Sequence, residues 1–191
     1  AAAKALAKLL KADPVFKDYE VIIAAGDGRQ DEEDTTNVKA YERVKQAIET
    51  HDKTITLTVG QLTVGVTVKE WSAVLMLCNL ESPSSYMQAA FRAQNPCRFQ
   101  GEDGKMYRKG NAYVFDFDPA RTLIIFDQFA NDLLSDTAGG SGTADDRRQN
   151  IKRLLNFFPV IGEDSDGEMV ELDAAKVLSI PRKLKSTEVV R

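Results

Sequence analysis

Four short runs rich in apolar and β-branched residues, separated by segments with helical periodicity, constrain the fold of this chain more than any other feature. The runs are EVIIAA (20–25), TITLTV (54–59), AVLMLC (73–78) and AYVFDF (112–117). Continuous apolar runs of this length are typical of strands that are buried on both faces of a parallel sheet. Because strands and helices alternate, the sequence predicts an α/β fold with a parallel, doubly wound sheet.

Helix signals lie between and after these runs. A helix is predicted to end before Asp13-Pro14, and another covers 35–50 with Val44 on its apolar face. Ser82-Pro83 and Asp118-Pro119 each combine an N-cap residue with a proline at the first helical position. Two helix starts are therefore predicted there.

The character of the chain changes after Asp118. Helical periodicity marks 123–133 and 151–158, and GGSGT (139–143) between them is predicted to be a flexible joint. The polar, glycine-rich segment 98–110 is predicted to be a loop. We expect a domain over 1–118 and a helical extension over 119–191 that packs on it and leads into a basic tail.

Composition excludes several classes of function. The 191 residues are 43% hydrophobic, which suffices for a core without disulfide or metal. One histidine, His51, and two cysteines without metal spacing exclude a Cys/His zinc site and disfavour a Ser-His or Cys-His catalytic machine. The net charge of −4 means that any contact with nucleic acid must be local. No metal site is predicted, because Asp116 lacks a second carboxylate ligand and Asp118 is explained as a helix cap.

No apolar run reaches the ~20 residues that span a bilayer, so we expect a cytoplasmic protein without membrane contact. The chain begins without Met and ends in the basic stretch PRKLKSTEVVR, so we expect it to be part of a longer polypeptide. It contains no GxxxxGK[ST] phosphate loop, and no GxGxxG follows a strand. The chain alone is therefore not expected to bind a nucleotide tightly or to hydrolyse ATP.

A strand, a Thr/Gly turn, a second strand and a helix follow one another in 56–96. The turn reads TLTVGQLTVGVTV and the helix carries YMQAAFRAQNP. This stretch resembles motifs V and VI of superfamily 2 helicases and translocases, whose motor has two RecA-like lobes with ATP between them. The sequence segments EWSAVLML, SPSSYMQAAFRAQNPC and NAYVFDFDPARTL resemble the helicase subunits of type III and type I restriction enzymes.

The resemblance implies catalytic roles in the motif VI helix. Arg92 corresponds to an arginine that reaches the γ-phosphate from the second lobe, where it stabilises the charge of phosphoryl transfer. Gln88 lies four residues earlier, on the same predicted helical face. Asn95 stands where the family has a second arginine, and Arg98 is a candidate substitute in nucleotide binding. An exposed polar pair on an amphipathic helix is the alternative interpretation of Gln88 and Arg92.

Motif V supplies the other candidate residues. The resemblance assigns contacts with the nucleic-acid backbone to Thr58, Gly60 and Thr63, and nucleotide contacts to Gly65 and Thr67. Thr67 occupies a position that is acidic in the family. Glycine turns let main-chain N–H groups approach a phosphate closely, although an ordinary connection between strand and helix explains the same residues.

The resemblance also implies cofactors and partners. ATP and Mg²⁺ would be held mainly by an N-terminal RecA-like lobe of a parent protein, and neither by this chain alone. The expected partners are the backbone of double-stranded DNA, that N-terminal lobe, and nuclease or methyltransferase parts of the parent. Two alternatives stay open: a non-catalytic RecA-like interaction module, and a free-standing α/β nucleotide-binding domain.

Overall fold

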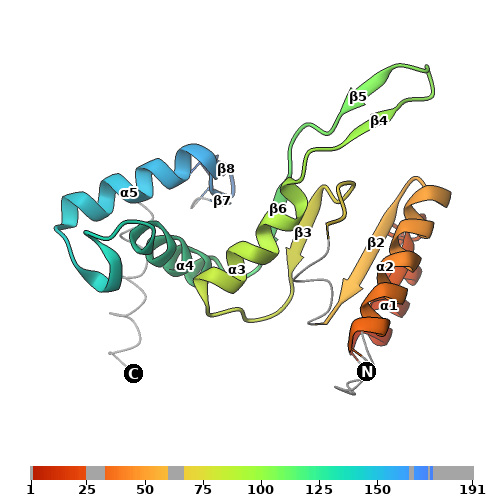
Figure 1. Cartoon of the computed structure of the whole chain (residues 1–191), viewed down its shortest axis with the longest axis horizontal. Helices are drawn as coiled ribbons and strands as arrows, with labels where there is room; N and C mark the ends of the chain where they lie inside the picture. The colour runs from red at the N-terminus through yellow and green to blue at the C-terminus, as the bar shows by residue number, and fades with distance from the viewer. Residues whose placement is uncertain (1, 25–32, 60–66, 164–165, 172, 174–191) are drawn as a thin grey trace. The chain divides into compact units, whose positions relative to one another are not determined.

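The computed structural model describes residues 2–24, 33–59, 67–163, 166–171 and 173. Two compact units are distinguished: unit 1 comprises Ala1–Val74 and Gln88–Tyr113, and unit 2 comprises Leu75–Met87 and Val114–Arg191. The predicted domains 1–118 and 119–191 stay a prediction. In chain order (Figure 1) the elements are α1 (Ala2–Ala12), β1 (Glu20–Ala24), α2 (Glu33–Thr50), β2 (Thr54–Thr58), β3 (Ala73–Met76), α3 (Pro83–Ala90), the 3₁₀ helix η2 (Phe91–Gln94), β4 (Arg98–Gln100), β5 (Met106–Arg108), β6 (Tyr113–Asp116), α4 (Pro119–Asp132), the 3₁₀ helix η3 (Ala138–Gly140), α5 (Ala144–Phe157), β7 (Ile161–Glu163) and β8 (Met169–Glu171).

Unit 1 is built on a parallel strand pair that helices cover on both faces. β1 and β2 pair in parallel, with Val21 opposite Ile55 and Ile23 opposite Leu57, and α2 connects them. Successive side chains of a strand point to opposite faces. Val21 accordingly joins a cluster with Ala7 of α1, whereas Ile22 belongs to a cluster with α2. The predicted burial of this strand on both faces is confirmed.

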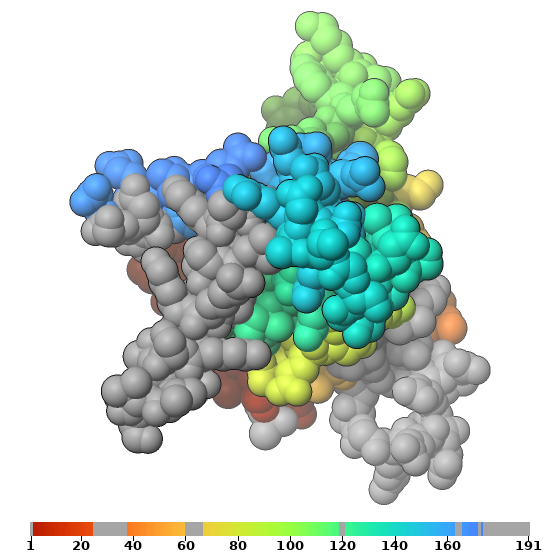
Figure 2. Space-filling model, turned by 90° about the vertical axis from the view of Figure 1, so that its left-hand side faces the viewer, coloured from red at the N-terminus to blue at the C-terminus, as the bar shows by residue number. Residues whose placement is uncertain are grey.

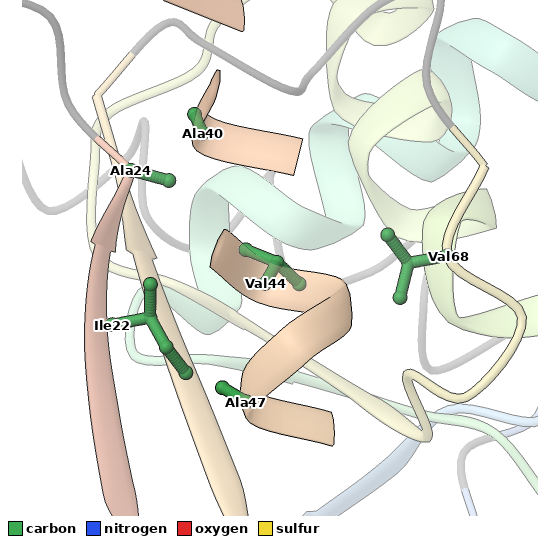
Figure 3. Close-up of a cluster of buried hydrophobic side chains, with 6 residues drawn as sticks. All are labelled: Ile22, Ala24, Ala40, Val44, Ala47 and Val68. Atoms are coloured by element: carbon green, nitrogen blue, oxygen red, sulfur yellow. The ribbon is translucent and has the colours of Figure 1, made fainter. Parts of the chain in front are cut away.

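The second cluster forms the α2 side of this core. Ala40, Val44 and Ala47 of α2 are directed toward Ile22 and Ala24 of β1, and Val44 lies between Ile22 and Val68 (Figure 3). Trp71 is half-buried against the same cluster, as expected of a residue that covers the strand pair. Small side chains on α2 permit the helix to lie close to the strands.

The strands of the described residues form four two-stranded sheets: β1–β2, β3–β6, β4–β5 and β7–β8. The mixed α/β class is therefore confirmed, and parallel pairing is confirmed for β1 and β2. The two other predicted strands, β3 and β6, pair with each other. Of their side chains only Met76 is buried, so the burial predicted for β3 on both faces is wrong. A complete RecA-like parallel sheet is not shown within the described residues.

One predicted helix end and two predicted helix starts are confirmed. α1 ends at Ala12, directly before Asp13-Pro14. The Asp118 side chain accepts a hydrogen bond from the N–H of Arg121 at 3.0 Å, with proline at the start of α4. The hydroxyl of Ser82 accepts one from the N–H of Ser85 at 3.4 Å at the start of α3.

Unit 2 contains α4 and α5, which lie where the sequence predicts helices. Buried polar side chains join them: Asn150 donates to the Thr137 hydroxyl at 2.9 Å, and that hydroxyl donates to the carbonyl of Asn131 at 2.8 Å. All three residues are buried. Hydrogen bonds of this kind are needed because an unpaired polar group in a protein interior is destabilising.

Arg121 of α4 connects further parts of unit 2. Its guanidinium donates to Asp116 at 2.7 Å and to the carbonyls of Cys78 and Leu80 at 3.3 and 3.1 Å. Asp116 is thus half of a partly buried ion pair. Within the described residues, no group of His, Cys, Asp and Glu could hold a metal ion.

One prediction about irregular segments is wrong: residues 98–110 were expected to be a loop, but they form the antiparallel hairpin β4–β5. GGSGT lies between α4 and α5 as predicted, where it contributes to η3, and Thr143 caps α5 in a capping box with Asp146. Its flexibility stays a prediction. In both segments glycines with positive φ, such as Gly104 at 76°, form the tight turns between elements. Within the described part of the chain, no helix is long and apolar enough to cross a bilayer.

Burial of Tyr86 predicts an alkaline transition. Desolvation raises the pKa of Tyr86 to about 12, against a smaller lowering by Thr122. Since the folded pKa lies above the ordinary value of 10.0, the stabilisation by neutral Tyr86 is complete below pH 10.0 and is lost as pH rises through about 12. A tyrosinate absorbance titration should lose its most alkaline step in Tyr86→Phe. Tyr113→Phe, at an exposed tyrosine, should retain that step; if it does not, the assignment is wrong.

Candidate functional site

Lys109 links three segments of unit 1. Its ammonium donates to the carbonyls of Lys69 at 2.8 Å, Trp71 at 2.7 Å and Ala93 at 2.8 Å. Burial lowers the pKa of Lys109 below its ordinary value of 10.5, whereas three carbonyl oxygens favour the charged form. This contact fixes the segment after the Thr/Gly turn beside the end of η2.

Arg92 lies in η2 and is half-buried. The amide of Asn95 donates to the carbonyl of Arg92 at 3.2 Å, and the next carbonyl, that of Ala93, is held by Lys109. Asn95 therefore has a local role in closing the end of η2.

Gln88 precedes this turn in α3 and is exposed. The α-helix ends at Ala90 and continues as a tighter 3₁₀ turn. The tighter turn, in which side chains three apart are eclipsed, begins at Phe91, between Gln88 and Arg92. Their proposed roles stay predictions.

The hairpin β4–β5 follows directly, with Arg98 opposite Arg108 and Phe99 opposite Tyr107. All side chains of its two strands are exposed, and the hairpin is drawn in light green at the top of Figure 2. The rings of Phe99 and Tyr107 stack with centroids 6.0 Å apart.

Local contacts define the turn of the hairpin. Asp103 accepts a hydrogen bond from the Tyr107 hydroxyl at 2.8 Å and from the N–H of Lys105 at 3.1 Å. These contacts lower the pKa of Asp103, the bond to the Lys105 N–H most strongly. A Cβ on Gly101 would lie 2.6 Å from the Tyr107 ring. Glycine at 101 therefore lets the ring cross the turn.

A pocket of about 480 Å³ lies at the base of the hairpin, and it is lined by Lys69, Glu70, Pro96, Cys97, Arg98 and Arg108. Three of these side chains are cationic. Glu70 binds Lys45 of α2 at 2.7 Å. Burial alone would raise the pKa of Glu70, but the Lys45 hydrogen bond and charge bring it below its usual value. The charge of Glu70 is thereby offset, and the pocket is suited to an anion.

The motif V candidates are only partly within the described residues. Thr58 is exposed at the carboxyl end of β2, and Thr67 is exposed beside buried Val68. Gly60, Thr63 and Gly65 lie outside the described residues.

Of the residues predicted with motif VI, which are Gln88, Arg92 and Arg98, only Arg98 lines the pocket. Lys69, Arg108 and Lys109 were not among the predicted site residues. A detectable signal was present, since RFQ and MYR are near mirror images about a glycine-containing turn.

One curated protein is similar to most of this chain. It is a Mycoplasma pneumoniae protein described as a "putative type II restriction enzyme and methyltransferase", C-terminus, and it is 30% identical over 166 residues. The match covers 84% of this chain and 21% of that protein, so the chain spans about a fifth of its relative's length. No family model matches the sequence, and no solved structure matches it significantly. The chain is related to a restriction–modification protein.

Loss of the Lys109 ammonium should destabilise unit 1. Lys109→Met would leave three carbonyls without their donor, and we expect a loss of about 2 kcal/mol in unfolding free energy, measured by urea denaturation. Lys105→Met, at an exposed lysine of the same hairpin, should change the unfolding free energy by less than about 0.5 kcal/mol. Equal effects of the two substitutions would contradict the bridging role.

Proposed function

We propose that this chain is the second motor lobe of an ATP-dependent DNA helicase or translocase that belongs to a restriction–modification enzyme. The relative in Mycoplasma pneumoniae supports the restriction–modification context. The resemblance to motifs V and VI supports a motor role in a type III or type I restriction system. In this proposal the paired strands β1 and β2 are part of a larger RecA-like sheet.

The observation that carries the proposal is the contact made by Lys109. Its ammonium joins the carbonyls of Lys69 and Trp71, which follow motif V, to the carbonyl of Ala93 in motif VI. A motor lobe must couple these two motifs mechanically, because one is assigned to DNA and the other to the nucleotide. A charged group that donates to three carbonyls is a stiff coupling of this kind.

The edge of the β1–β2 pair supports the assignment of Thr58 to the DNA backbone. Ligands of open α/β sheets bind outside the carboxyl ends of the strands. Thr58 is exposed at that end of β2, and 60–66 follow it directly. Thr58, Gly60 and Thr63 are proposed to contact phosphates rather than base edges, which suits tracking along DNA of any sequence.

Arg92 is proposed to act at the nucleotide, with Gln88, Gly65, Thr67 and Arg98 as further candidates. When bound, ATP with Mg²⁺ supplies the free energy for movement, and both are held mainly by another RecA-like lobe. The guanidinium of Arg92 fits an anion in charge and in its fork of donors. It would stabilise negative charge on the transferring phosphoryl group and respond to closure of the lobes.

A second candidate function is a non-catalytic interaction module within a restriction–modification protein. One observation favours it: Arg92 is half-buried within the described structure, as a structural arginine would be. The two candidates differ in what substitution of Arg92 does to ATP hydrolysis.

The test is DNA-stimulated ATPase activity of the full-length protein that contains this chain. For a motor lobe, Arg92→Lys and Arg92→Ala should lower kcat by on the order of 10³-fold, because the arginine acts on charge that develops during phosphoryl transfer. Gln94→Ala, at an exposed position of the same η2 turn, is the matched control and should retain activity.

Thermal unfolding of each variant separates loss of function from loss of structure. If Arg92→Lys is folded and hydrolyses ATP at the unsubstituted rate, the motor role of Arg92 is wrong and the interaction module is favoured.

A further inference from the structure

The hairpin β4–β5 places two arginines directly opposite each other. Arg98 and Arg108 are register partners across an antiparallel pair, and directly opposed residues share one face of the hairpin. Like charges in this arrangement are destabilising. An anion bound between the two guanidinium groups would convert this repulsion into attraction.

No carboxylate among the described residues neutralises the pair. The ion pairs of the described chain include neither Arg98 nor Arg108. Of the two acids in the hairpin turn, Asp103 is engaged by Tyr107 and Lys105, and Glu102 is exposed. The hairpin segment 97–110 holds four cations and two acids, although the chain as a whole has a net charge of −4.

A third cation, Lys69, lies with the two arginines in the pocket at the base of the hairpin. Lys69 lines it together with Arg98 and Arg108, and the one carboxylate in the lining, Glu70, is bound to Lys45. The carbonyl of Lys69 is held by Lys109. The backbone that carries Lys69 is therefore fixed relative to the end of β5.

We propose that Arg98, Arg108 and Lys69 form a binding site for a phosphate of the DNA backbone, separate from the motif V residues. One arginine can bind a phosphate through two N–H groups at once. Contacts with phosphates do not depend on the base sequence of the DNA. This inference rests on the proposed function for the identity of the partner as DNA, and it assigns Arg98 to DNA rather than to ATP.

The opposite face of the hairpin provides an internal control. Side chains alternate between faces along a strand, so Phe99 and Tyr107 lie on the face away from the arginines, where their rings stack on each other. A site for phosphate needs the arginine face and not the aromatic face. Phe99→Leu therefore leaves every cation of the proposed site in place.

The experiment measures binding of the 191-residue chain to a fluorescent duplex oligonucleotide of arbitrary sequence by anisotropy, over a range of salt concentrations. Arg98→Gln and Arg108→Gln should each weaken binding by roughly tenfold at low salt, as expected for a charge-assisted hydrogen bond of about 1.4 kcal/mol or more. The double substitution should reduce the slope of log affinity against log salt by about 0.9, since the site holds one phosphate and each lost phosphate contact contributes about 0.9.

Two variants serve as controls. Lys8→Gln removes an exposed cation from α1 and should leave affinity and slope nearly unchanged, as should Phe99→Leu on the opposite face. Unchanged affinity in the double variant would overturn the proposal, and so would an equal loss in Lys8→Gln. A loss in Phe99→Leu as large as in Arg98→Gln would also overturn it, because base stacking would then carry the binding.

A competition arm distinguishes the two sources of phosphate. If ATP with Mg²⁺ at micromolar concentration displaces the DNA from the unsubstituted chain but not from the double variant, the pocket is a nucleotide site and the proposal fails. Because the assay needs no ATP hydrolysis, its outcome is independent of the Arg92 test. Failure of the motor role and failure of the phosphate site can thus be told apart.

Discussion

The Lys109 ammonium is the interaction on which the arrangement of the candidate site depends. A partly buried charge is tolerated only when it is well paired, and here three main-chain carbonyls supply the pairing. These carbonyls lie 16 to 40 residues before Lys109 in the sequence. One lysine thus connects segments that are distant in the sequence, as a disulfide or a metal ion does in many small domains. Arg92, Lys69 and the base of the hairpin derive their relative positions from it.

The parts of the fold that the sequence predicts well have causes that are local. EVIIAA is recognisable as a strand because its burial on two faces requires apolar residues at every position, and Val21 and Ile22 contact different helices. The start of α4 is recognisable because Asp118-Pro119 caps a helix through its own side chain and ring. Such signals need no knowledge of distant contacts.

The parts that the sequence does not predict depend on contacts without a sequence pattern. The strands of the hairpin are three residues long and exposed on both faces. The near mirror symmetry of RFQ and MYR is therefore a weak signal, because no apolar alternation accompanies it. Lys109 binds carbonyl oxygens, which every residue possesses, so nothing in the sequence identifies its partners. The spacing of Gln88 and Arg92 indicates a shared face only if α-helical geometry continues, and it ends at Ala90. The assigned roles of Thr58, Thr67 and Arg92 stay predictions.

The packing of α1 against β1 has a practical consequence for any shortened version of this protein. α1 covers the side of the β1–β2 pair that contains Val21 and Leu57, and Leu6 and Leu10 pack there as well. Truncation of the first twelve residues would uncover an apolar strand surface of the kind that promotes aggregation. Fusion partners and affinity tags should therefore be attached in a way that leaves this helix intact.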